Sequence, residues 1–118
     1  MATDIFKKGS VEMISLLLLW EADSYGYQIV QSIKERSGGL LTVQEGSLYP
    51  VLYRLAENEY ITSREELTKT KAGRSRIRII YSITDKGKEH LKELKREYDT
   101  VHDGIHHIFS GSEVILNE

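Results

Sequence analysis

The spacing of the hydrophobic residues changes twice along this chain, and this change most limits the folds that the sequence can adopt. In the first half these residues recur every three or four positions, which predicts helices over about 10–22, 25–36 and 44–58. They then alternate with polar residues, which predicts strands over 60–67 and 76–83. After the second strand the hydrophobic residues again recur every three or four positions, as far as Ile108. The expected fold class is therefore mainly α with a small β-hairpin.

Length and composition place the chain among ordinary globular proteins. Its 118 residues suit one folded domain, and its 40% hydrophobic content is enough to form a core. The absence of cysteine excludes a disulfide framework and a thiolate metal site. The longest apolar run, 16–20, is far shorter than the roughly 20 residues that cross a bilayer. We therefore expect a cytoplasmic protein with no membrane partner.

Positive charge is concentrated in one block, although the whole chain has a formal net charge of −2. Residues 64–96 carry 11 basic and 5 acidic side chains, whereas 97–118 carry 5 acidic and no basic ones. The loop predicted at 68–75 and the strand after it contain cations with no acid between them: Lys69, Lys71, Arg74, Arg76 and Arg78. A block of this kind attracts a polyanion. The alternative is a loop that only increases solubility.

The order of the predicted elements is that of a winged helix-turn-helix. In this fold the third helix lies in a major groove of DNA, and the hairpin contacts the flanking backbone. The basic loop falls at the tip of the hairpin, where phosphate contacts are expected. We therefore predict a DNA-binding domain over 1–84. Its wing contacts are expected from Lys69, Lys71, Arg74 and Arg76.

The C-terminal third of the chain carries a heptad pattern. A helix over 85–110 would be about 39 Å long at 1.5 Å per residue, which is more than a core of this size covers. We expect self-association through it, joined by the first helix, which is apolar on nearly all sides. The alternative is a helix that lies across its own domain, and 111–118 are expected to form a disordered tail. The predicted interface contains Leu17, Trp20, Leu91, Leu94, Tyr98, Val101, Ile105 and Ile108.

Three motifs resemble those of a known family, the PadR-like transcriptional regulators, in its short type with a single C-terminal dimerisation helix. YGYQIVQSIKERSGG at 25–39 resembles the family's second helix, and GSLYPVLYRLAENEYI at 46–61 resembles its recognition helix. YSITDKG at 81–87 resembles the end of its wing. Leu-Tyr-Pro inside a helix is the most specific of these strings. The chain departs from the family pattern at Tyr25, at Ser47 and in the wing sequence AGRSRIRIIY.

The resemblance implies DNA contacts from the second and third helices. Ser47 and Tyr49 are expected to reach base edges or phosphates through their hydroxyl groups, with packing against the second helix as the alternative for Tyr49. Tyr27 resembles a family tyrosine that supports or contacts the backbone, and a plain packing role is its alternative. Apart from the resemblance, Gln44 and Arg54 lie at or along the third helix, where they could read adenine or guanine edges, and the sequence does not fix their orientation.

A ligand site is implied by the same resemblance. Tyr98 lies on the helix that the family uses for dimerisation, where an aromatic effector is expected, and Trp20 is a second candidate to line that site. The alternative is that both are ordinary interface aromatics. His102 and His106 have metal-ligand spacing, but solvated polar residues explain them, so no metal site is predicted. No catalytic residues and no cofactor are predicted, because the carboxylates are scattered, the sequence has no glycine-rich phosphate loop, and no Ser, His and Asp arrangement is discernible.

The combined interpretation is a homodimeric regulator that binds double-stranded DNA, most simply a repressor relieved by a small planar aromatic effector or a stress signal. Two-fold symmetry predicts a pseudo-palindromic operator with half-sites about one helical turn apart. The alternative is a dimeric winged-helix module that uses its hairpin to bind an acidic protein partner and has no operator. Salt dependence separates the two, because only an operator reader keeps a preferred sequence near physiological salt.

Overall fold

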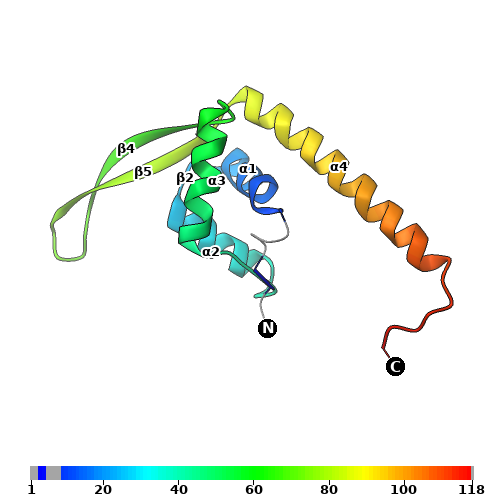
Figure 1. The fold of residues 1–118 in the computed structure, drawn as a ribbon. Coiled ribbons are helices and arrows are strands. Elements are labelled where there is room, and N and C mark those ends of the chain that lie inside the picture. Colours follow the sequence, from blue (N-terminus) through cyan, green and yellow to red (C-terminus); the bar gives the residue numbers. More distant parts are fainter. Residues whose placement is uncertain (1–2, 5–8, 118) are drawn as a thin grey trace.

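Four helices and a long hairpin form the part of the chain that the computed structural model describes, residues 3–4 and 9–117 (Figure 1). The hairpin lies between the third and fourth helices, as expected, and consists of β4 (Ile61–Lys69) and β5 (Ser75–Ile83). We call residues 61–83 the wing. The mainly α fold class is confirmed. The helices are α1 (Val11–Glu21), α2 (Gly26–Arg36), α3 (Glu45–Glu57) and α4 (Asp85–Ser110).

The core lies where the first three helices meet the base of the wing. Leu16 of α1 and Leu48 of α3 are completely buried there, and Ile61 joins them from the first residue of β4. Burial of one such side chain contributes about 1.5–3 kcal/mol, so this cluster fixes how α3 sits relative to the wing. The opposite side of α1 is open, because Leu17 and Trp20 are 45% and 40% exposed.

The turn after α2 determines where α3 can begin. Gly38 and Gly39 have φ values of +66° and +80°, a region that glycine adopts without steric cost. The Gly39 N–H donates to the carbonyl oxygen of Lys34 at 2.8 Å, which satisfies an acceptor that the end of the helix leaves unpaired. The chain therefore reverses within a few residues and enters α3 beside α2.

Three very short strands were not predicted. β2 (Ser24–Tyr25) pairs with β5, which gives a three-stranded antiparallel sheet in the order β2-β5-β4. β1 (Thr3–Asp4) pairs in parallel with β3 (Leu41–Thr42). Strands of two residues have no alternation to detect, and only pairing with a distant segment defines them. The wing strands are also longer than expected, so the loop shortens from 68–75 to 70–74.

α4 leaves the core after its third turn and extends away from it (Figure 1). Leu91 is buried and Leu94 packs partly against the core, but Tyr98, Val101 and later heptad residues are about half exposed or more. The expected alternative, in which the helix lies across its own domain, is therefore wrong for its second half. Among the described residues, no helix is long and apolar enough to cross a membrane.

A tight junction fixes the start of α4 against the core. The N–H of Thr84 donates to the carbonyl oxygen of Tyr60 at 3.0 Å, and the Thr84 hydroxyl accepts from the N–H of Gly87 at 3.0 Å. His90, one turn further on, stacks on the Tyr60 ring at 3.9 Å, and its Nε2 lies 2.7 Å from Oε1 of Glu12 in α1. These contacts determine the direction in which α4 leaves the domain.

We expect Gly87→Ala to destabilise the protein strongly, because a Cβ at this position would lie 2.0 Å from the carbonyl oxygen of Tyr60. Backbone must move to relieve that overlap, at a cost of about 3 kcal/mol in the free energy of unfolding. Gly104→Ala is the matched control, because a Cβ there meets nothing within 4 Å. It should stabilise α4 by up to about 1 kcal/mol. Urea unfolding measures both, and equal effects would contradict the junction described above.

Candidate nucleic-acid interface

The outer face of α3 is open to solvent. The inner face of α3 is buried through Leu48, Val51, Leu52 and Leu55. Gly46, Pro50 and Tyr53 lie near the centre of the opposite, outer face. Gln44 is exposed at the N-cap, Arg54 is exposed, and Ser47 is half-buried at the edge of the outer face. The structure therefore places these three sequence-predicted residues on or beside one accessible helix face.

Tyr49 both packs against α2 and remains accessible. A Cβ built on Gly26 would lie 2.8 Å from the hydroxyl oxygen of Tyr49 and 2.9 Å from its ring, so the ring rests on that glycine. The side chain is nevertheless 45% exposed. The expected packing alternative is therefore correct for the ring. A DNA contact of the hydroxyl group stays a prediction.

Tyr53 is the residue of this face that the sequence analysis missed. It is 70% exposed, more than any other aromatic side chain that the structure describes. It follows Tyr49 by one helical turn, and both line a shallow pocket of about 420 Å³ with Ser63 and Tyr81 of the wing. The sequence did contain a signal for this exposure, because the helical spacing of the buried leucines places Tyr53 on the opposite side of the helix.

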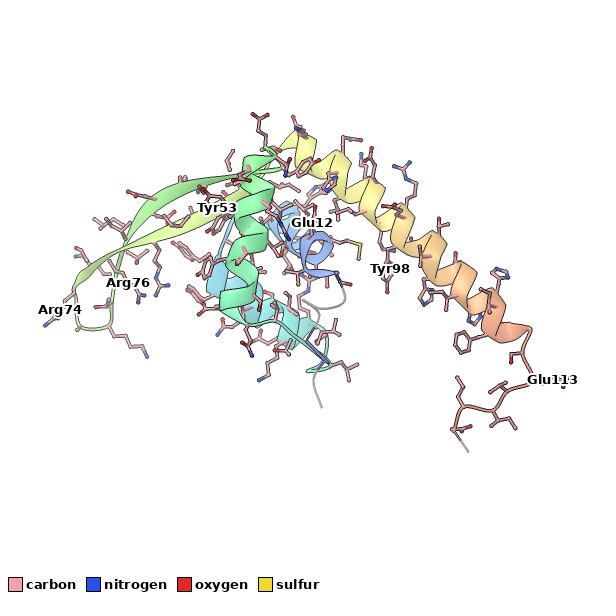
Figure 2. All side chains as sticks on the ribbon, viewed as in Figure 1. Glu12, Tyr53, Arg74, Arg76, Tyr98 and Glu113 are labelled. Carbon is pink, nitrogen blue, oxygen red and sulfur yellow. The ribbon has the colours of Figure 1, made fainter. Side chains whose placement is uncertain are left out.

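The wing turn presents its cations to solvent on a well-defined hairpin. The N–H of Thr70 donates to the carbonyl oxygen of Arg74 at 2.8 Å, and Gly73 supplies the φ of +78° that the turn requires. Arg74 and Arg76 lie at the far end of the wing (Figure 2). Among the described residues, no salt bridge neutralises Lys69, Lys71, Arg74 or Arg76, and all four are exposed.

An aromatic cluster that was not predicted ties the wing to α2. The rings of Tyr25 and Tyr27 stack at 5.9 Å, and the guanidinium carbon of Arg78 lies 4.8 Å from the centre of the Tyr27 ring. The Tyr25 hydroxyl donates to Glu66 of β4 at 2.5 Å. Tyr27 therefore packs against Arg78 of β5, and its expected contribution to binding the DNA backbone stays a prediction. The pairing of β2 with β5 brings these residues together, and sequence spacing gave no sign of it.

The hydrogen bond to Glu66 raises the pKa of Tyr25 above its ordinary value. The neutral hydroxyl is therefore favoured in the folded state, and its contribution is complete below about pH 10 and is lost as pH rises through the raised pKa. We expect the stability of the protein to fall more steeply above pH 10 than that of Tyr25→Phe. Urea midpoints from pH 8 to 11 measure this difference, and parallel pH profiles would contradict it.

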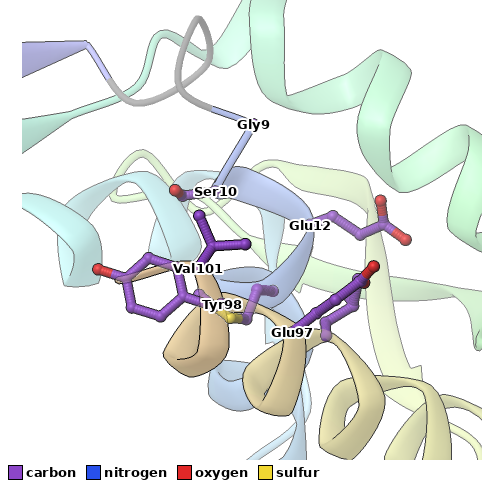
Figure 3. A pocket seen from close by; sticks show the side chains of 8 residues that line it. Gly9, Ser10, Glu12, Glu97, Tyr98 and Val101 are labelled. Atoms are coloured by element: carbon purple, nitrogen blue, oxygen red, sulfur yellow. The ribbon is translucent and has the colours of Figure 1, made fainter. Parts of the chain in front are cut away.

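The two residues expected to share an effector site line separate pockets of one chain. Trp20 lines a largely apolar groove of about 760 Å³ between α1 and α4, with Ile14, Leu17 and Leu91. Tyr98 lines a smaller pocket of about 390 Å³ beside Glu12 and Glu97 (Figure 3). A single chain therefore does not bring the two aromatic side chains into one cavity.

Comparisons with known proteins agree with this architecture. The model of the PadR-like transcriptional regulator family matches residues 15–93. The Lysinibacillus sphaericus protein named "Uncharacterized protein X" has 34% sequence identity to this chain, and the match covers 90% of this chain and 94% of that protein. A transcriptional regulator from Clostridium thermocellum has a solved structure with a TM-score of 0.73 and 32% identity, covering 85% of this chain and 90% of that one.

A further solved structure is that of Bacillus subtilis PadR in complex with operator DNA. It has a TM-score of 0.62 and 28% identity, and the match covers 71% of this chain and 45% of that chain. The three-helix core, the paired wing and the long final helix define a winged helix-turn-helix protein of the kind that regulates transcription. The chain belongs to the PadR-like family of transcriptional regulators, as its motifs indicated, and this family is one of regulators rather than enzymes.

Proposed function

We propose that this chain is a sequence-specific regulator in which α3 enters a major groove of double-stranded DNA and the wing contacts the adjacent backbone. The observation that carries the proposal is the set of exposed, unneutralised wing cations on a hairpin beside the open face of α3. Cations of this kind release counterions from phosphates and supply affinity, while side chains on the helix read base edges. The residues assigned to DNA are Tyr27, Gln44, Ser47, Tyr49, Arg54, Lys69, Lys71, Arg74 and Arg76.

Residues 1–84 form the DNA-binding unit in this proposal, 85–110 the dimerisation helix, and 111–118 a tail outside both. The support for a homodimer is the uncovered apolar surface of α4 together with Leu17 and Trp20 of α1. Each protomer then presents one α3, so the operator is pseudo-palindromic with half-sites about one helical turn apart. A second copy also covers the groove between α1 and α4.

Repression, with relief by a small aromatic effector, is the regulatory mode that we infer. A ligand acts this way only if it binds the arrangement that does not fit the operator more tightly than the one that does. Trp20 and Tyr98 are the candidate contacts. Because Trp20 is the only tryptophan, saturable quenching of its fluorescence by a planar aromatic compound is the expected result. A panel of such compounds without one saturable response would contradict the effector site.

Fluorescence anisotropy at about 150 mM salt tests the DNA-binding function. The duplexes are the DNA upstream of the protein's own coding region, a scrambled version of it, and sequences enriched by the protein from a randomised pool. We expect a preference of about a thousandfold for at least one duplex over the scrambled one. Equal and weak binding to all of them would contradict operator recognition and favour the dimeric protein-binding module.

A further inference from the structure

The wing carries an apolar surface as well as cations. Alternate residues of a strand share a face. The face on which Ile61 is buried and its partner Ile83 is half-buried therefore continues outward along β5 through Tyr81 and Ile79. It ends at the cross-strand pair Leu67 and Ile77, which are 69% and 62% exposed. We call Leu67, Ile77 and Ile79 the wing ridge.

The core does not need the outer end of this ridge. On β5 the buried residue is Ile80, which lies on the opposite face and is 8% exposed. The outer residues of the ridge are therefore not needed to bury β5 against the domain. Only one cross-strand pair, Thr68 with Arg76, separates Leu67 and Ile77 from Lys69 and Ser75, where the hairpin turn begins. Exposed strand surface normally carries charged or polar side chains. Two large aliphatic side chains at the tip of a projecting hairpin therefore indicate a surface that becomes covered when the protein acts.

The surroundings of the ridge indicate which kind of molecule covers it. Lys69 lies beyond Leu67 on the same face, and Lys71 and Arg74 follow in the turn. The one acid on this face of the wing strands, Glu65, pairs with Ile79 at the inner end of the ridge, away from the tip. A polyanion such as DNA would neutralise these wing cations. A minor groove of DNA combines phosphates along its walls with deoxyribose and base surface on its floor, and proteins that bend DNA place apolar side chains there between cations.

The position of the ridge fits the same occupant. Its face is the one that packs at the base of the wing on the helical core, and its next inward residue, Tyr81, lines the shallow pocket with Tyr49 and Tyr53 of α3. The ridge therefore lies on the α3 side of the wing. A duplex that receives the outer face of α3 in its major groove would meet the ridge where the neighbouring minor groove begins.

We propose that Leu67 and Ile77 form an apolar wedge that enters the minor groove flanking each half-site and bends the DNA. This inference rests on the proposed DNA-binding function. Contact with the wedge requires partial unstacking of a base step, whose cost depends on the sequence of that step. Pyrimidine–purine steps such as TA unstack easily, whereas A-tracts are stiff. The wedge therefore gives the protein a preference for flexible flanking steps at positions where it makes no hydrogen bond to a base.

The test measures the bend angle and the affinity on defined duplexes. The probe is the tightest duplex enriched from a randomised pool, labelled at its ends for energy transfer and prepared with either TA steps or an A-tract at the flanks. We expect the wild-type protein to bend the TA duplex by about 40° and to bind it about tenfold more tightly than the A-tract duplex. The double variant Leu67→Thr, Ile77→Thr, which keeps strand-forming residues, should lose most of the bend and the flank preference.

Two control variants separate the wedge from other effects. Leu40→Thr replaces a residue that is 68% exposed outside the wing, and it should bend DNA like the wild type. Lys71→Gln should weaken binding to both duplexes equally and retain the bend. Thermal melting checks that all variants are folded.

The outcomes distinguish the wedge from the function on which it rests. Specific binding with no bend, or a bend that the double variant retains, would overturn the wedge and leave the regulator intact. Failure of the wild type to enrich any duplex would instead overturn the DNA-binding function. If the double variant bends DNA normally but loses a higher-mass assembly in light scattering, the ridge is a protein-docking surface and the wedge is again overturned.

Discussion

Ile105→Glu is expected to convert the protein from a dimer to a monomer at micromolar concentration and to lower its affinity for an operator by about a hundredfold. Ile105 is 51% exposed in the single chain, so the substitution should leave the fold of the protomer intact. In a dimer the same position lies in the seam, where an unpaired carboxylate is costly to bury. The loss of affinity follows because a monomer reaches only one half-site and loses the gain of simultaneous binding.

His107→Glu is the matched control for this experiment. It adds the same carboxylate two residues further along α4, on the side of the helix opposite to the seam. It should remain dimeric. Light scattering coupled to size exclusion measures the mass, and anisotropy measures affinity for one and two half-sites. A wild-type monomer at micromolar concentration would contradict both the seam and the palindromic operator.

The double variant Lys71→Gln, Arg74→Gln is expected to lower DNA affinity by about a hundredfold at physiological salt and to do so for every sequence. Both side chains are exposed in the wing turn, which suits contact with phosphates. Each phosphate contact contributes about 0.9 to the slope of log affinity against log salt. A dimer carries both substitutions twice, so the slope should become shallower by about 3.6.

Two comparisons make the charge argument specific. Arg74→Lys keeps the cation and should retain the salt slope, and Lys86→Gln removes a cation from the start of α4 and should also retain it. The ratio of specific to scrambled affinity should stay unchanged in the double variant. A changed base preference with an unchanged slope would show that these residues read bases rather than phosphates.

The sequence predicted the elements well where they are long and periodic. The inward residues of α3 and the heptad residues of α4 repeat at helical spacing, so both helices ended within a few residues of the expected positions. The cations of the wing turn were also predictable, because the turn is short and charged side chains there have little core to enter. The strand boundaries were less accurate, since backbone pairing rather than side-chain pattern extends β4 and β5.

Several features of the candidate site depend on residues that are distant in the sequence. Tyr25 and Glu66 are 41 residues apart, and only the pairing of β2 with β5 places the tyrosine ring beside the wing. The Tyr49 ring rests on Gly26 because α2 and α3 pack closely where no Cβ intervenes. No local pattern encodes either contact, and the exposure of Tyr53 follows from the same packing.

The sequence by itself determined the fold class, the family, the cationic wing and the heptad surface, because periodicity, motif and charge are local properties of a chain. Only the tertiary structure decided which apolar residues those elements leave uncovered. The base of the wing packs on the core and its tip does not, so Ile83 is half-buried and packed against the core while Ile77 on the same face is exposed. α4 likewise buries Leu91 and exposes Ile105 on one continuous seam, because the core ends between them.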